Sequence, residues 1–401
     1  MNTSEQMPKN QYTTGLPAPA LEALEHSQSL CHRIRAEILR AGHISFHRFM
    51  QMSLYEPGLG YYSAGAKKIG HAGDFITAPE ISSLFTHCLA VQCHQILLEI
   101  NNGVILEVGP GSGVMMCSLL KVLEEKNALP ESYLVLEPGA DLRNRQQQLV
   151  RERIPHLEHR ISWLDQLPDQ PFEGMIIGNE VLDAMPVNRI VLKDGHFLEL
   201  CVNVDGESFG WSARELNNQL QSQVELVLGE FVPGLPDGYM TELNAQIGSW
   251  IFSMTSILNR GAMLFIDYGY PRREYYHPQR IEGTLLCHYR HKVHHNPFIY
   301  PGLQDITASV DFTSVAEAAV AAGIQVSGYT TQAHFLMNCG LEAVMNEYNL
   351  TTDMDRVELG RQVRMLTMPG EMGERFKVIA LTKDLDIPLM GFRNFDQRQR
   401  L

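Results

Sequence analysis

A short glycine-rich segment constrains the fold of this chain more than any other feature. Residues 104–108 form an apolar run that contains Glu107, and Gly109, Gly111 and Gly113 follow at alternate positions before a segment of helical periodicity. This order predicts a strand, a tight loop and a helix start. Glycine lets the loop backbone approach a ligand closely, and free N–H groups at the helix start face the same point. The segment therefore predicts an α/β fold with a nucleotide-type cofactor site.

The spacing of the glycines narrows the choice of cofactor. A dinucleotide fingerprint is G-x-G-x-x-G, whereas this loop is G-x-G-x-G with an acid two residues before it, which disfavours a nicotinamide enzyme. S-adenosylmethionine (SAM) suits the loop better, because it carries cationic groups and has no phosphate. A loop that is rich in glycine for packing alone is the alternative. We expect the SAM contacts to include Glu107, Gly109, Pro110, Gly111 and Gly113 of this segment. Pro79 and Asn179 are expected to contact SAM from other segments.

Glu137 and Asp165 each follow a short apolar segment that predicts a further strand. Ligands of open α/β sheets bind at the carboxyl ends of the strands, so both acids are expected beside the glycine loop. Glu137 would accept the ribose hydroxyls, and Asp165 would accept from the adenine amino group. Trp163 or Leu164 would flank the adenine ring. The alternatives are a solvated acid before a turn for Glu137 and a core position for Trp163.

The next apolar segment, residues 174–178, runs directly into Asn179, Glu180 and Asp183. It therefore places an amide and two carboxylates at the mouth of the expected site. In a helical turn, Glu180 and Asp183 would share one face because they are three residues apart. These acids could hold a cation against the methyl donor. Alternatively, Asn179 or Asp183 caps a helix.

The composition argues against several classes of protein. A net charge of −14 disfavours a primary nucleic-acid binder, and seven cysteines without a C-x-x-C pair indicate a reducing compartment without a thiolate metal site. No apolar run reaches the ~18 residues that span a bilayer, and residues 1–19 lack the pattern of a signal peptide. We expect a cytoplasmic protein with no integral membrane segment, no nucleic-acid partner and no bound metal.

Changes of pattern along the chain predict its organisation. The predicted regions are a disordered N-terminus (residues 1–20), a helical region with a lid (21–100), the SAM-binding core (101–383) and a loose tail (384–401). Two Asp-Gly turn signals predict an antiparallel insertion over about residues 187–240. Helices are expected over about 241–258 and over the segment 333–364.

Two segments allow more than one interpretation. Residues 69–80, which include Asp74 and Pro79, combine small, aromatic and acidic side chains. They form either a lid over the site or an ordinary surface loop. Residues 288–295 are rich in histidine on an expected loop. Because no carboxylate clearly neighbours them, a polar loop or a substrate-facing rim is favoured over a metal site.

Six segments in order resemble the motifs of the MidA-like methyltransferase family. They are residues 55–62, 73–80, 106–113, 178–187, 265–270 and 372–377. The resemblance covers about residues 25–383 and implies a class I SAM-dependent methyltransferase, with a Rossmann-like sheet, an N-terminal helical region and an inserted antiparallel subdomain. The mitochondrial relatives are respiratory complex I assembly factors, and for them the resemblance implies symmetric arginine dimethylation of a complex I subunit. This chain resembles the bacterial members. One departure is Ser309, where the family pattern has histidine.

The implied reaction is direct methyl transfer to an arginine nitrogen. Glu180 is the first choice to localise the guanidinium charge, with Asp183 or Asp74 as the second acid and Asn179 as a positioning group. The expected partner is a protein with an arginine-containing segment, and a homodimer is left open. The alternatives are a methyltransferase that acts on RNA or a small molecule, and an assembly chaperone that binds SAM without turnover.

Overall fold

The structure is a computed structural model that describes residues 15–64, 77–101, 103–348 and 351–401. Within these ranges, the largest sheet has eight strands in the order β15-β16-β10-β5-β2-β3-β4, and β14 pairs with the last residues of β10. Strands β10, β5, β2, β3 and β4 pair in parallel, whereas β16 runs antiparallel to β10 and β15. The strands are β2 (Val104–Val108), β3 (Tyr133–Leu136), β4 (Ile161–Leu164), β5 (Phe172–Asn179), β10 (Leu258–Tyr270), β14 (Val310–Asp311), β15 (Gln325–Thr331) and β16 (Phe376–Lys383).

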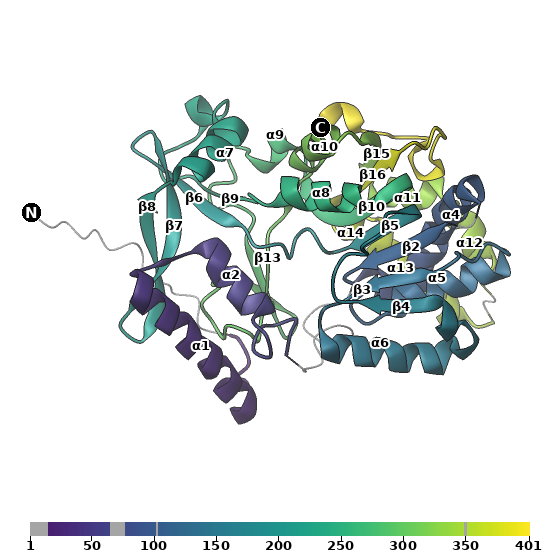
Figure 1. Cartoon of the computed structure of the whole chain (residues 1–401), viewed down its shortest axis with the longest axis horizontal. Helices are drawn as coiled ribbons and strands as arrows, with labels where there is room; N and C mark the ends of the chain where they lie inside the picture. Colours follow the sequence, from purple (N-terminus) through teal and green to yellow (C-terminus); the bar gives the residue numbers. More distant parts are fainter. Residues whose placement is uncertain (1–14, 65–76, 102, 349–350) are drawn as a thin grey trace, which may run out of the picture.

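Helices cover both faces of this sheet (Figure 1). Neighbouring strand residues alternate between two buried clusters, because successive side chains of a strand point to opposite faces. Ile105 and Leu264 pack with α4 and α5, whereas Leu106 and Phe265 pack with α8 and α10. The helices around the sheet are α4 (Ser83–Ile100), α5 (Val114–Glu125), α6 (Ala140–Arg153), α8 (Ile247–Ser256), α10 (Phe312–Ala321), α11 (Gln332–Asn338), α12 (Leu341–Asn346) and α13 (Asp353–Thr367). This arrangement confirms the predicted α/β, Rossmann-like class.

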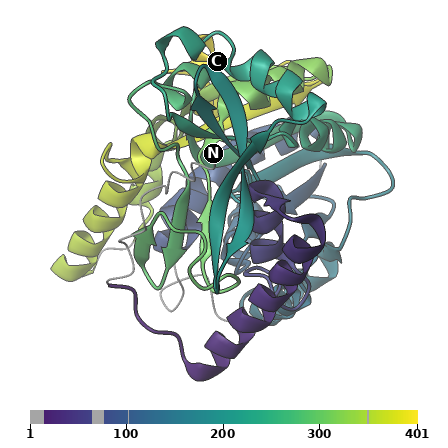
Figure 2. The same ribbon diagram turned by 90° about the vertical axis from the view of Figure 1, so that its left-hand side faces the viewer.

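A second, antiparallel sheet lies beside the first and carries the N-terminal helices (Figures 1 and 2). Its order is β1-β7-β6-β9, with β8 paired to β7. Gly195 and Gly206 adopt φ of 78° and 60° in its hairpin turns, as the Asp-Gly signals predicted. Its elements are β1 (Ile44–Ser45), β6 (Asn188–Lys193), β7 (His196–Asp205), β8 (Ser208–Glu215) and β9 (Met240–Leu243), with α1 (Leu21–Ala41), α2 (Phe46–Tyr55) and α7 (Asn218–Leu228) beside them. The predicted antiparallel subdomain is therefore present.

The N-terminal region and the insertion are not structurally separate. Ile44 of β1 pairs with Val202 of β7, and α1 and α2 share a buried cluster with β7 and β8. These contacts do not test the predicted domain boundaries at residues 100 and 187, which stay predictions. Asp74 and residues 69–76 of the expected lid lie outside the described residues, whereas the end of this segment begins α3 (Ala78–Ile81).

The prediction of a loose tail over residues 384–401 is wrong, because part of this tail packs into the core. Leu385, Leu389 and Phe392 are buried in the cluster beneath α4 and α11. The amide of Gln397 donates to the carbonyl of Tyr329 in β15, at 2.7 Å. The tail is ordered because its apolar residues complete the core, although most of its other residues are polar.

Two smaller predictions also differ from the structure. The helix expected over 241–258 begins only at Ile247, because residues before it form β9 in the antiparallel sheet. The histidine-rich segment forms strands rather than a loop, in a three-stranded sheet of β11 (Leu286–Tyr289), β12 (Lys292–His294) and β13 (Asp305–Thr307). Among the helices that are described, none is long and apolar enough to cross a membrane.

Candidate cofactor and acceptor site

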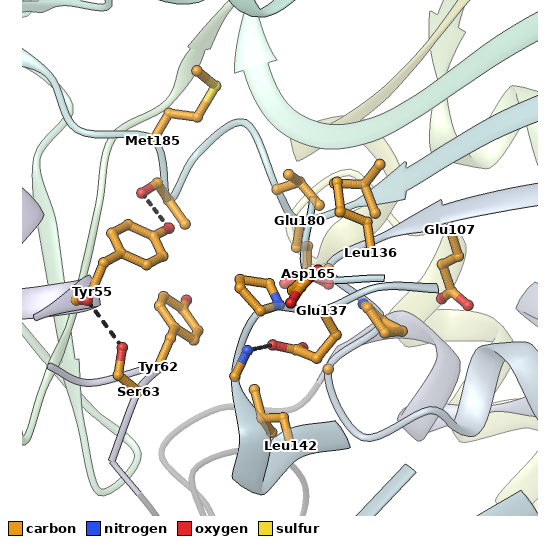
Figure 3. A pocket seen from close by; sticks show the side chains of 18 of the residues that line it. Tyr55, Tyr62, Ser63, Glu107, Leu136, Glu137, Leu142, Asp165, Glu180 and Met185 are labelled. Carbon is orange, nitrogen blue, oxygen red and sulfur yellow. Dashed lines mark hydrogen bonds between the residues drawn. The ribbon is translucent and has the colours of Figure 1, made fainter. Parts of the chain in front are cut away.

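A cavity of about 1000 Å³ opens where β2, β3, β4 and β5 end, between the central sheet and the N-terminal helices. Figure 3 shows its two sides, with Tyr55 and Tyr62 opposite Glu107. The carboxyl ends of parallel strands are the usual ligand site of such a sheet. The predicted residues that line the cavity are Pro79, Glu107, Gly109, Pro110, Gly111, Glu137, Asp165, Asn179 and Glu180. Gly113 and Asp183 lie outside its lining.

The three glycines of the loop adopt the left-handed backbone that their type permits. The φ angles of Gly109, Gly111 and Gly113 are 60°, 55° and 80°. A Cβ atom on Gly109 would lie 3.2 Å from Val181, and one on Gly113 would lie 3.2 Å from Gln146. Gly109 and Gly111 therefore shape the cavity wall, whereas Gly113 lets the loop pack against α6.

The acids at the ends of β2 and β3 are both buried and hydrogen-bonded. Tyr133 donates its hydroxyl to Glu107 Oε2 at 2.7 Å, and burial raises the pKa of Glu107 to about 7. The amide of Gly139 donates to Glu137 Oε1 at 2.8 Å, and burial raises the pKa of Glu137 despite this bond. A bound cation would favour the ionised form of each acid.

Gln146 of α6 is a site residue that the sequence analysis missed. Its Nε2 donates to the carbonyl of Gly111 at 2.9 Å and to Glu137 Oε2 at 3.3 Å. Its Oε1 accepts from the indole N–H of Trp163 at 3.0 Å. Gln146 thus ties the glycine loop to Glu137. Trp163 is absent from the cavity lining, so the expectation of an adenine contact is wrong for this residue.

The other expected adenine contact also differs in part. Leu164 packs against the cluster on the α8 side and does not line the cavity. Asp165 does line it, together with Gln166 and Leu167, directly after β4. The strand end is therefore at the cavity, but the apolar residue that lines it, Leu167, follows Asp165 instead of preceding it.

Glu180 lies at the end of β5 with a left-handed backbone. Its φ is 54°, and no helix begins between it and Asp183, so the expected helical turn and helix cap are wrong. The side-chain amide of Asn179 donates to Glu180 Oε1 at 3.2 Å. Burial, and then the neighbouring carboxylate of Asp183, raise the pKa of Glu180 to about 8. A cationic partner would stabilise its carboxylate form.

Asp183 is 5% exposed and lies behind the cavity wall. Tyr268 is within hydrogen-bonding reach of its carboxylate, but burial outweighs this contact and raises the pKa of Asp183 to about 6. The position of Asp183 therefore does not allow direct contact with an acceptor in the cavity. Its nearness to Glu180 gives it an electrostatic role.

Tyr55 and Tyr62 form an aromatic wall that the sequence analysis quoted only as part of a family motif. Their rings line the cavity and stack with centroids 5.5 Å apart. The Tyr55 hydroxyl donates to the carbonyl of Ala184 at 2.9 Å, and that of Tyr62 donates to Asp305 Oδ1 at 3.0 Å. The first bond joins the N-terminal region to the loop after Glu180, and the second joins it to β13. No local sequence signal announces them, because the partners are far apart in the chain.

The lining has a strongly biased charge. It includes Glu107, Glu137, Asp165 and Glu180, and no Lys, Arg or His occurs among the described residues that line the cavity. This environment suits SAM, which carries an ammonium and a sulfonium group. The same bias makes the end of the cavity around Glu180 suited to a cation.

The departure at Ser309 lies elsewhere. Ser309 lines a second cavity of about 460 Å³ and donates its amide to Thr284 Oγ1 at 3.1 Å. A serine here therefore leaves the lining of the main cavity unchanged. In the described part of the chain, no group of three or more potential ligands could hold a metal ion.

Comparisons with known proteins agree with this geometry. Residues 88–330 match the family described as "Putative S-adenosyl-L-methionine-dependent methyltransferase". A solved protein from Burkholderia thailandensis, bound to S-adenosyl-homocysteine, is 39% identical with a TM-score of 0.91, over 96% of this chain and 100% of that one. Fold and site together define a class I SAM-dependent methyltransferase, and SAM is its cofactor. The chain belongs to the MidA-like family of these enzymes.

Curated relatives carry a more specific name. The mitochondrial "Protein arginine methyltransferase NDUFAF7 homolog" of Drosophila melanogaster is 28% identical, over 96% of this chain and 93% of its own. The protein arginine methyltransferase NDUFAF7 of Danio rerio is 27% identical, over 93% of this chain and 94% of its own. The match thus extends over nearly the full length of both relatives.

Proposed function

We propose that this methyltransferase transfers the methyl group of SAM to arginine side chains of a protein partner. The observation that carries the proposal is Glu180, a carboxylate that lines a cavity whose described lining contains no Lys, Arg or His. The names of the NDUFAF7 relatives support arginine as the acceptor. A respiratory complex I subunit is the first partner to test, and the cytoplasm is the proposed location.

The residues of the cavity would divide the work as follows. SAM supplies a methyl group that its sulfonium already activates. Glu107, the glycine loop and Glu137 would hold the cofactor, and Asp165 would bind its base. Glu180 would accept hydrogen bonds from the guanidinium, which localises the positive charge away from the attacking nitrogen. That nitrogen would gain the methyl carbon as the carbon–sulfur bond breaks and S-adenosyl-homocysteine leaves as a neutral thioether, and it would lose a proton to a carboxylate at this end of the cavity.

The position of Asp183 bears on the proposed choice of the second acid. Because Asp183 lies behind the wall, we propose that it acts on the charge of Glu180 rather than on the acceptor. Asp74 keeps its place as a proposed acceptor contact outside the described residues. Asn179 would hold the Glu180 carboxylate in place through its side-chain amide.

Methyl transfer into a cell extract tests the proposal. Labelled SAM and the enzyme are added to an extract of cells that lack this protein, and the label is followed in protein, RNA and small molecules. We expect label in protein, recovered as methylarginine after hydrolysis and absent with Glu180→Gln. Label in RNA or metabolites would show that the acceptor is an RNA or a small molecule and not a protein arginine. Binding of SAM with no label in any fraction would favour an assembly chaperone.

A further inference from the structure

We propose that Asp267 is a positioning residue that fixes the direction of Glu180 by binding the backbone of the three residues after it. Asp267 is 1% exposed and is absent from the lining of the cavity, so it does not touch a ligand there. Any influence on the reaction must therefore pass through a neighbour. The role of Asp267 in the reaction rests on the proposed function of Glu180. Its anchoring of the backbone after Glu180 does not depend on that function.

Both oxygens of Asp267 accept backbone hydrogen bonds. The amides of Val181, Leu182 and Asp183 donate to Oδ2 at 3.1, 2.9 and 3.2 Å. The amide of Tyr268 donates to Oδ1 at 2.9 Å. Three successive amides that converge on one oxygen form an anion-binding nest, here occupied by a side chain of the same protein.

Glu180 needs such an anchor because its backbone is unfavourable for a residue with a Cβ atom. Its φ of 54° lies in the left-handed region, which non-glycine residues rarely adopt. The amide of Glu180 donates to the carbonyl of Ile266 at 2.9 Å, so the chain is tied to β10 immediately before the nest as well. Ile266 and Asp267 thus hold the backbone on both sides of the Glu180 side chain.

The far end of the same loop is tied independently of Asp267. The carbonyl of Asp183 accepts from the amide of Ala308 at 3.0 Å, and the carbonyl of Ala184 accepts from Tyr55. Loss of the nest should therefore release the amides of residues 181–183 while the loop stays attached. The expected effect is a local change at Glu180 in a folded protein.

Variants at Asp267 test the anchor without using activity. Amide hydrogen exchange is followed at residues 181–183 in the wild type, Asp267→Asn and Asp267→Ala. Exchange there should be at least about tenfold faster in Asp267→Ala and intermediate in Asp267→Asn, which keeps one acceptor oxygen. Glu242→Gln is the matched control, because Glu242 is also buried and accepts a backbone amide, from Thr284, but lies in the antiparallel sheet. Unchanged exchange at 181–183 in both Asp267 variants would overturn the anchor.

A double-mutant cycle with Glu180→Gln tests whether Asp267 acts through Glu180. Asp267→Asn should lower kcat about 10- to 100-fold, leave the Kd for SAM within about threefold, and cause no further loss in the Glu180→Gln background. An equal loss in both backgrounds would make Asp267 a general structural residue and overturn the proposal. If the wild type labels an acceptor other than arginine, the proposed function fails, and the same cycle with that acceptor still decides the role of Asp267.

Discussion

Glu180 combines three properties in one residue. It has a left-handed backbone, it faces the cavity, and its pKa is raised to about 8 by burial and by Asp183. Strained and electrostatically perturbed residues are common at functional sites because the surrounding structure must hold them. This combination suits a site whose carboxylate is ionised mainly when a cation is bound beside it.

The raised pKa predicts the pH dependence of the reaction. The carboxylate form of Glu180 binds the acceptor, so kcat/KM should rise as the pH increases through about 8 and level off above it. Asp183→Asn removes the neighbouring like charge and should move this rise to lower pH. The measurement is kcat/KM between pH 6 and pH 9.5. A rise that persists unchanged in Glu180→Gln would assign it to another group.

The position of the cofactor site is determined by the glycine loop and the strand ends beside it. Its glycines, Glu107 and the strand ends at Glu137 and Asp165 follow from local pattern, since parallel strands bring their ends to one edge. The backbone conformation of Glu180 could not be predicted from the local sequence. The expected helical turn is replaced by hydrogen bonds to residues 266 and 267, which belong to a strand far away in sequence. Local periodicity contains no information on such contacts.

Gly109→Ala tests the loop against a matched glycine. Gly109 and Gly206 have the same φ of 60°, but Gly206 lies in an exposed hairpin turn with open space around it. Each substitution should cost about 1 kcal/mol of unfolding free energy, because alanine is strained at this φ. Only Gly109→Ala should also weaken SAM binding, by about tenfold or more, measured by titration calorimetry. Equal SAM affinity in both variants would contradict the assigned loop.

At the scale of the whole molecule, the site is assembled from distant parts of the chain. Tyr55 and Tyr62 come from the N-terminal region, Gln146 from α6, and the ordered tail completes the core behind the sheet. The sequence predicted the strand segments that end at the site and the acids at their ends. It did not predict the aromatic wall or the packed tail, which depend on contacts between residues far apart in sequence.

Phe392→Ala tests the packing of the tail. Phe392 is 5% exposed and contacts Phe335 with ring centroids 5.6 Å apart, so truncation should cost about 3–5 kcal/mol of unfolding free energy. Phe395→Ala, three residues further on at 66% exposure, is the control and should cost less than about 1 kcal/mol. Denaturant unfolding measures both. Equal, small losses would restore the interpretation of residues 384–401 as a loose tail.

The central claim is that Glu180 holds a cationic acceptor beside SAM, and Glu180→Gln tests it most directly. The measurement pairs the rate of labelled methyl transfer to protein arginine with the Kd for SAM in the same preparations. We expect a fall in kcat of about 10² or more with the Kd within about threefold of the wild type, because a preorganised charge is lost and the cofactor contacts remain. A parallel loss of SAM binding, or an unchanged rate, would contradict it.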